Sequence, residues 1–160
     1  MSQSQEIIKS FTHPVKFRMF LFYKLPSAFF SGVRVRELSE EKCVTSVPYK
    51  WLTQNPFRST YFASLAMAAE MSTGVLALVH LHKRNPPVSM LVVKLEANYF
   101  KKAVGKTFFT CEEGNAIRET IENAVTTGEG QSIRAKSVGR NDKGELIAEF
   151  FITWSFKAKR

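Results

Sequence analysis

One long apolar segment constrains the fold of this chain more than any other feature. Between Arg58 and His80 the sequence reads STYFASLAMAAEMSTGVLALV, and Glu70 is its only charged residue. Its apolar residues recur at three- and four-residue spacings on all sides, which predicts a buried helix over about residues 58–80. A lone carboxylate in such a helix costs free energy unless another group pairs with it, protonates it or uses it. Glu70 is therefore the first candidate for a functional residue.

A membrane-spanning helix is the alternative for this segment, because about 20 apolar residues suffice to cross a bilayer. The central glutamate, several Ser and Thr residues and the Asn55-Pro56 dipeptide before the segment all oppose that interpretation. Many small residues narrow the helix, so that a curved sheet can wrap closely around it. We therefore expect the central helix of a soluble domain.

The size and the cysteines indicate a single domain from a reducing compartment. The chain has 160 residues and is 44% hydrophobic, which is enough for one substantial core. Cys43 and Cys111 have neither the spacing of a metal site nor that of a disulfide framework, and no uninterrupted apolar stretch follows the start MSQSQEIIKS. We expect a cytoplasmic protein in which both cysteines are small strand residues.

The net charge of +9, from 23 Lys and Arg against 14 Asp and Glu, favours anionic partners. Nucleic acid, acidic lipid headgroups and a phosphate-bearing small molecule all fit this description. The basic residues are scattered, and none lies in an aromatic RNP-type strand or a helix-turn-helix, so we do not expect nucleic-acid binding. His13, His80 and His82 have no acidic or cysteine companions at metal spacing, so we assign no metal.

The order of the predicted elements is typical of an α+β domain in which one antiparallel sheet wraps a central helix. Residues of about 4–25 suit an amphipathic helix disturbed at Pro14, within an N-terminal helical segment of residues 1–31 that packs on a domain of residues 32–160. The basic and aromatic face of that helix leaves a lipid-surface role as an alternative to packing. Besides the central helix, we expect strands at 33–38, 42–50, 88–100 and 106–111, a short helix at 114–127, and a hairpin of 132–140 with 144–156.

Three pieces of the sequence together resemble the hotdog-fold acyl-thioester hydrolases of the phenylacetate-pathway type. In that family an Asn is followed six residues later by His-Gly-Gly, and an acidic residue lies further along the central helix. Here Asn55 is followed by Tyr61-Phe62-Ala63, and Glu70 lies nine residues after Tyr61. NYFKKAVGK resembles the strand that the family writes as Phe-Leu-Arg-Pro-Ala, and DKGELIAEFFITW resembles its last hairpin.

The resemblance covers roughly residues 32–156. Its nearest match is a branch of uncharacterised thioesterase-like hotdog domains with an N-terminal helix, a layout like that of DUF4442. It implies a hotdog fold and a homodimer, or a dimer of dimers, in which the sheets join into one layer and the thioester site lies at the subunit interface. The implied activity is hydrolysis of an acyl-CoA or acyl-carrier thioester, with the coenzyme A thioester as substrate and no cofactor.

The resemblance also implies roles for the matching residues. Glu70 takes the position of the catalytic carboxylate, which activates water or attacks the thioester carbonyl, and burial is expected to raise its pKa. The first N–H groups of the helix, near Phe62 and Ala63, polarise the carbonyl oxygen. Asn55 orients the water or holds its loop.

The sequence departs from the family pattern at several of these positions. Tyr61 replaces the His, Phe62-Ala63 replaces Gly-Gly, and Lys102 replaces the usual Pro, although Lys101 and Lys102 can still meet the phosphates of coenzyme A. Glycines let a substrate approach the backbone closely, whereas a Phe side chain obstructs it or turns into the acyl pocket. A non-catalytic hotdog module, which binds an acyl chain or serves as a dimeric scaffold, is therefore the alternative function.

Overall fold

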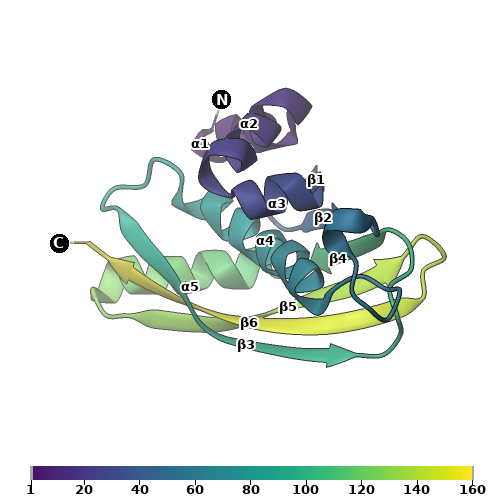
Figure 1. Ribbon diagram of the computed structural model, residues 1–160. Helices are drawn as coiled ribbons and strands as arrows, with labels where there is room; N and C mark the ends of the chain where they lie inside the picture. The colour runs from purple at the N-terminus through teal and green to yellow at the C-terminus, as the bar shows by residue number, and fades with distance from the viewer. Residues whose placement is uncertain (1, 160) are drawn as a thin grey trace.

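The computed structural model describes residues 2–159, which form a hotdog fold: an antiparallel sheet wraps around one long helix (Figure 1). The sheet of these residues has six strands in the order β1-β2-β4-β5-β6-β3. Their bounds are β1 (Arg34–Leu38), β2 (Cys43–Val47), β4 (Thr107–Cys111), β5 (Gln131–Asn141), β6 (Leu146–Ala158) and β3 (Val88–Tyr99). The expected α+β class and the expected strands are confirmed.

The central helix, α4 (Phe62–Leu81), begins a few residues later than the sequence predicts. Residues 54 and 60 form an isolated antiparallel bridge, and Tyr61 is extended at φ −61° and ψ 135°, so the helix starts only after this bridge closes. The helix has the length and hydropathy to cross a bilayer, but 67% of its most apolar window is buried in the domain. It is thus the core helix of the domain.

Buried hydrogen bonds join α4 to the inner face of the sheet. The hydroxyl of Thr45 on β2 donates to the main-chain oxygen of Ala68 at 2.6 Å, and the hydroxyls of Ser72 and Ser137 lie 2.7 Å apart. Small residues along α4 let the sheet approach this closely, as the sequence predicts. The helix is therefore held in one rotational position, which decides where each of its side chains points.

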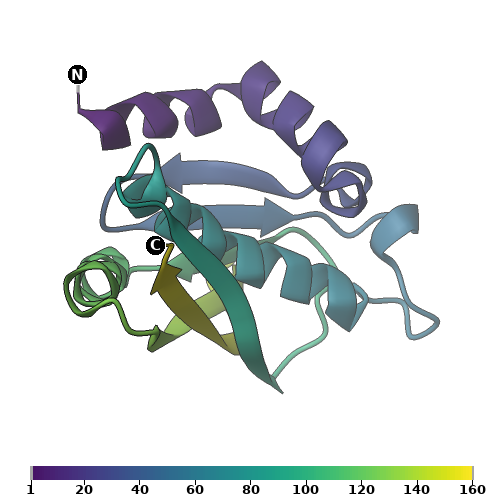
Figure 2. The ribbon, with the colours of Figure 1, turned by 90° about the vertical axis from the view of Figure 1, so that its left-hand side faces the viewer.

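The N-terminal segment differs from the single disturbed helix that the sequence predicts. α1 (Gln3–Thr12) and α2 (Pro14–Lys24) are separated by His13 alone, which has an extended backbone. Proline cannot donate the N–H that would continue α1, but it suits the first position of a new helix, so the chain breaks rather than kinks. α3 (Pro26–Ser31) follows. Figure 2 shows these helices above α4, and α5 (Gly114–Thr127) below it at the left.

β3 is an open edge of the sheet. It pairs with β6 alone, and α4 packs mainly on β2, β4, β5 and β6. Leu95 lies opposite the buried Ile152 and so faces the same side as α4, yet it is 45% exposed. Leu91 and Val93 are also exposed. The edge thus presents both unpaired backbone groups and apolar side chains.

Candidate functional site

Glu70 lies on α4 beneath the corner where α2 meets α3. Two small cavities meet at this residue, with volumes of about 90 and 180 Å³. The smaller is largely apolar, with Phe17, Leu25 and Trp154 in its wall, and the larger is bordered by residues 24–28. Because burial disfavours the charged form, the pKa of Glu70 is raised above its usual value.

Within residues 2–159, no hydrogen bond or ion pair offsets this effect on the pKa of Glu70, and desolvation is its sole cause. Gly74 lies one turn further along α4, and a Cβ at that position would come within 3.1 Å of Trp154 and 3.2 Å of the Oε1 atom of Glu70. The absence of a side chain at Gly74 therefore lets the indole ring and the carboxylate approach the same stretch of helix. A carboxylate in this position can take a proton from a water molecule at neutral pH.

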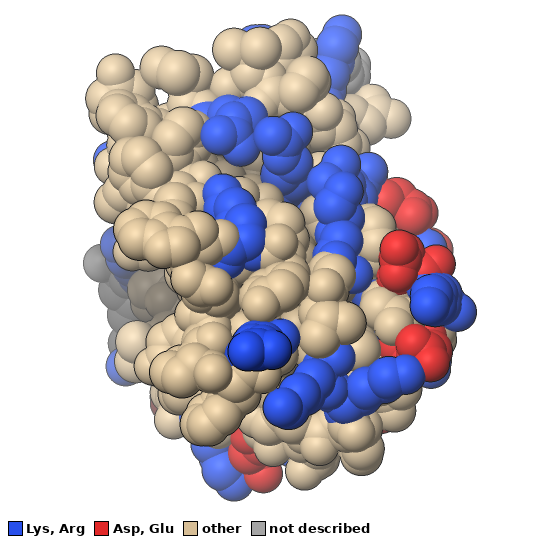
Figure 3. Space-filling view, turned by 45° about the vertical axis from the view of Figure 1, so that its right-hand side comes forward, with Lys and Arg blue, Asp and Glu red and all other residues tan. Residues whose placement is uncertain are grey.

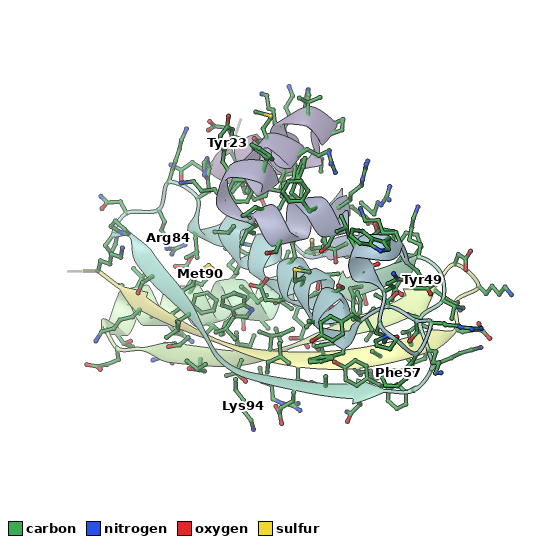
Figure 4. All side chains as sticks on the ribbon, viewed as in Figure 1. Tyr23, Tyr49, Phe57, Arg84, Met90 and Lys94 are labelled. Atoms are coloured by element: carbon green, nitrogen blue, oxygen red, sulfur yellow. The ribbon has the colours of Figure 1, made fainter. Side chains whose placement is uncertain are left out.

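A larger cavity, of about 540 Å³, lies at the N-terminal end of α4. It brings together five of the seven predicted site residues, which are Asn55, Tyr61, Phe62, Lys101 and Lys102. Ala63 and Glu70 are not among the residues that line it. Sequence reasoning also missed three aromatic residues in its wall, Phe57, Tyr99 and Phe100. Only the position of Tyr99-Phe100 directly before the two lysines indicated them, and Figure 4 shows Phe57 at this end of the domain.

The N-terminus of α4 offers free hydrogen-bond donors to this cavity. The N–H of Tyr61 donates to the main-chain oxygen of Thr53 at 2.7 Å, but no side chain caps the helix. Within the described residues, the N–H groups of Phe62 and Ala63 have no hydrogen-bond acceptor. Such groups carry the positive end of the helix dipole and can polarise a carbonyl oxygen. The rings of Tyr61 and Phe62 stand beside them, with centroids 4.9 Å apart.

The side chain of Asn55 forms hydrogen bonds within its own loop. Its Oδ1 atom accepts hydrogen bonds from the N–H groups of Phe57 and Ser59, at 2.9 and 3.2 Å, and from the hydroxyl of Ser59 at 3.2 Å. Its Nδ2 atom donates to the main-chain oxygen of Thr60 at 3.4 Å. Of the two predicted roles, this geometry fits the holding of the loop, because the oxygen already has three donors.

The two lysines differ in their surroundings. Lys101 forms an exposed ion pair with Glu145, whereas the Nζ atom of Lys102 lies 3.4 Å from the main-chain oxygen of Phe57. An exposed ion pair contributes little free energy and exchanges readily with a competing anion. Both side chains are therefore available to a negatively charged ligand at the mouth of the cavity.

The structure does not bring Glu70 to the N-terminus of its own helix. Eight residues separate Phe62 from Glu70, which corresponds to about 12 Å along the axis of α4. A water molecule and a carbonyl group that react must lie within about 3.5 Å of each other, with donors about 3 Å from the carbonyl oxygen. One chain thus carries the carboxylate and the donors in two separate places.

Comparisons with known proteins agree with this fold. Residues 16–156 match the family described as "Domain of unknown function (DUF4442)". A solved protein of unknown function from Pseudomonas aeruginosa, described as a probable thioesterase, is 18% identical over 94% of this chain and 99% of its own, with a TM-score of 0.77. A thioesterase from Haemophilus influenzae is 12% identical over 90% of both chains, with a TM-score of 0.65. At these identities the likeness establishes the fold alone. No curated protein matches the chain in sequence.

Proposed function

Because the chain belongs to the DUF4442 family and has a hotdog fold, we propose that it is a thioesterase that hydrolyses acyl-CoA or acyl-carrier thioesters. In this proposal the protein is a cytoplasmic homodimer, and Glu70 is the general base. The observation that carries the proposal is the desolvated carboxylate of Glu70, which has a raised pKa and no partner within residues 2–159, at the meeting point of two cavities. The names of solved proteins with this fold agree with that activity.

The separation within one chain supports a site shared by two protomers. Glu70 and the N–H of Phe62 are about 12 Å apart along one helix, so a second, antiparallel copy of α4 is needed to bring the two groups together. The open edge of β3 provides a surface for such a dimer, because its unpaired backbone groups can pair with a second β3. The exposed Leu95 would then be covered by the partner.

The proposed reaction needs only water as co-substrate. A water molecule attacks the thioester carbonyl carbon while Glu70 takes its proton, and the N–H groups of Phe62 and Ala63 stabilise the oxyanion that forms. The carbon–sulfur bond then breaks, the proton on Glu70 passes to the leaving thiolate, and the products are a carboxylic acid and a thiol. Tyr61 and Phe62 line the acyl side of the cavity, whereas Lys101 and Lys102 meet the phosphates of coenzyme A.

The alternative is a hotdog module that binds an acyl chain without hydrolysing it. Phe62 favours this function. Its exposed ring stands beside the free N–H groups of the helix, at a position where the similar thioester hydrolases have a glycine, and it can obstruct the approach of the thioester carbonyl. Binding of acyl-CoA without release of thiol would support this alternative against the proposed hydrolysis.

The test is thiol release from a panel of acyl-CoA thioesters with short to long chains. Wild type should hydrolyse at least one of them, and Glu70→Gln should lower kcat by about 10²- to 10⁴-fold with an unchanged circular dichroism spectrum. Phe62→Pro and Phe62→Ala form a matched pair, because both lose the ring but only proline also loses the N–H. Proline is tolerated at the first position of a helix, so Phe62→Pro should be the less active of the two. Equal activity of Phe62→Pro and Phe62→Ala would show that the N–H group of residue 62 does not contribute to hydrolysis.

Mixing the variants tests whether the site is shared. Glu70→Gln and Phe62→Pro each damage both sites of their own homodimer, but a mixed dimer retains one intact site. After subunit exchange at equal concentrations, activity should return to about a quarter of the wild-type level. If the mixture stays as inactive as its components, the carboxylate and the donors do not act across the interface.

A further inference from the structure

We propose that the exposed face of α2, together with α3 and the short helix η1 (Trp51–Thr53), docks on the surface of a membrane that contains anionic lipids. This docking is independent of the hydrolysis proposed above.

α2 is apolar on both of its sides, although only one side faces the domain. Phe17 and Leu21 are buried against the core. The opposite side is open, with exposed apolar side chains at the spacing of one helical face, which are Val15, Met19, Phe22 and Tyr23. A contiguous group of exposed apolar side chains is uncommon on a domain that acts alone, so this stripe indicates a partner that the chain itself does not supply.

The stripe continues onto neighbouring elements. The rings of Phe22 and Phe30, on α2 and α3, have centroids 6.3 Å apart, and Phe22 also contacts Tyr23 at 5.3 Å. η1 packs beside α3 and adds Trp51, which is 79% exposed. Figure 4 shows Tyr23 at the outer side of the N-terminal helices, away from the sheet. Exposed Phe, Tyr and Trp side chains are the residues that proteins place at the level of lipid headgroups.

The charge of this segment selects the kind of partner. Residues 7–36 contain no Asp or Glu but six basic residues, which are Lys9, Lys16, Arg18, Lys24, Arg34 and Arg36. Within residues 2–159, none of the six forms an ion pair. In Figure 3, the top of the molecule, where Figure 1 places the N-terminal helices, shows Lys and Arg among uncharged residues and no acidic residue.

An anionic bilayer fits this combination better than a second copy of the chain does. A second copy would bring the same six positive charges face to face, which is unfavourable. A bilayer with acidic headgroups attracts them instead, and Lys16 and Lys24 are both exposed on the helix that carries the apolar stripe. The aromatic side chains can then enter the interface between headgroups and acyl chains.

The docking face adjoins the carboxylate described above. The cavity of about 180 Å³ that reaches Glu70 is bordered by Lys24, Leu25 and Pro26, at the end of the same stripe. When the protein is docked on the membrane, this cavity would therefore lie next to the lipid surface.

Flotation with vesicles tests the proposal. Wild type should bind vesicles of phosphatidylcholine with about one third phosphatidylserine, should bind phosphatidylcholine alone much more weakly, and should lose binding as salt is added. Phe22→Ser/Tyr23→Ser and Lys16→Glu/Lys24→Glu should each weaken binding to anionic vesicles by about tenfold or more.

Two variants away from the docking face serve as controls. Val104→Ser removes an exposed apolar side chain from a loop, and Lys143→Glu/Lys157→Glu makes the same change of net charge as Lys16→Glu/Lys24→Glu. Both should bind vesicles with less than about a threefold change, and circular dichroism should show that all four variants are folded. No binding by wild type, equal binding to both kinds of vesicle, or wild-type binding by both variants of the face would overturn the proposal. If wild type binds no vesicles and Phe22→Ser/Tyr23→Ser forms a smaller oligomer than wild type does, the face instead contacts a second copy of the chain.

Discussion

The indole N–H of Trp154 donates a hydrogen bond to the hydroxyl of Thr73 at 2.8 Å. Thr73 in turn donates to the main-chain oxygen of Glu70 at 2.8 Å, so two consecutive bonds connect the inner face of β6 to the turn of α4 that carries the carboxylate. Both Trp154 and Thr73 are buried. Trp154 is therefore a positioning residue for Glu70 as well as part of the core.

Replacing this tryptophan should destabilise the domain. Trp154→Phe removes the indole N–H, so the buried hydroxyl of Thr73 loses its hydrogen-bond donor. The free energy of unfolding should therefore fall by about 1–3 kcal/mol. Urea denaturation followed by circular dichroism measures this change. Trp51→Phe is the matched control, since Trp51 is 79% exposed, and it should change the free energy of unfolding by less than about 0.5 kcal/mol. Equal effects of the two substitutions would contradict the assigned role of the bond.

Glu70 should make stability fall as the pH rises. Its pKa is raised in the folded state, so the folded domain holds the proton more tightly than the unfolded chain does. This contribution is complete below the usual pKa of 4.5 and is lost as the pH rises through the raised value. Glu70→Gln should therefore melt at a higher temperature than wild type at about pH 8, by about 3–5 °C for each pKa unit of increase.

The same comparison at about pH 4 should show little difference, because the carboxyl group is then protonated in both states. Glu119→Gln removes one exposed acid and is the control for net charge. A Glu70→Gln variant that is no more stable than wild type at high pH would show that the carboxylate has a partner in solution.

Charges on the edge of β3 should prevent the proposed dimer. Leu95→Lys places an ammonium group on the inner side of this strand, where a partner protomer would otherwise cover the leucine. Light scattering should show a dimer for wild type at micromolar concentration and mainly monomer for Leu95→Lys, with thiol release reduced in parallel. Val104→Lys, at an exposed loop position, should remain dimeric. A monomeric wild type would exclude the shared site.

The two cysteines should be inert in the folded protein. Cys43 and Cys111 lie opposite each other on β2 and β4, and both are buried. Burial raises the pKa of Cys111 to about 12 and that of Cys43 above its usual range, so little thiolate forms near neutral pH. A thiol reagent at about pH 8 should label neither cysteine in native protein and both in denaturant. Fast labelling of the native protein would show that this part of the sheet opens readily.

Local sequence patterns were sufficient for most elements of the fold. The apolar periodicity around Glu70 predicted α4. Alternation predicted the first two strands, and β-branched or aliphatic content together with turn residues predicted the others, because these patterns reflect burial and local backbone preference. The break at Pro14 was located correctly, but not its result. Whether a proline kinks a helix or ends it depends on packing against the rest of the domain, which a local pattern does not contain.

The candidate site was only partly predictable. Asn55, Tyr61 and Phe62 are close in sequence, so their common position at the start of α4 followed from local structure. The surroundings of Glu70 could not be predicted in this way. The α2–α3 corner lies more than 40 residues from Glu70 in the chain, and Trp154 lies more than 80 residues from it. The sequence by itself determined that α4 is a largely buried helix and that it carries a single carboxylate. Only the tertiary structure decided what surrounds that carboxylate and how far it lies from the free donors of its helix, because contacts between distant segments depend on how whole elements pack together.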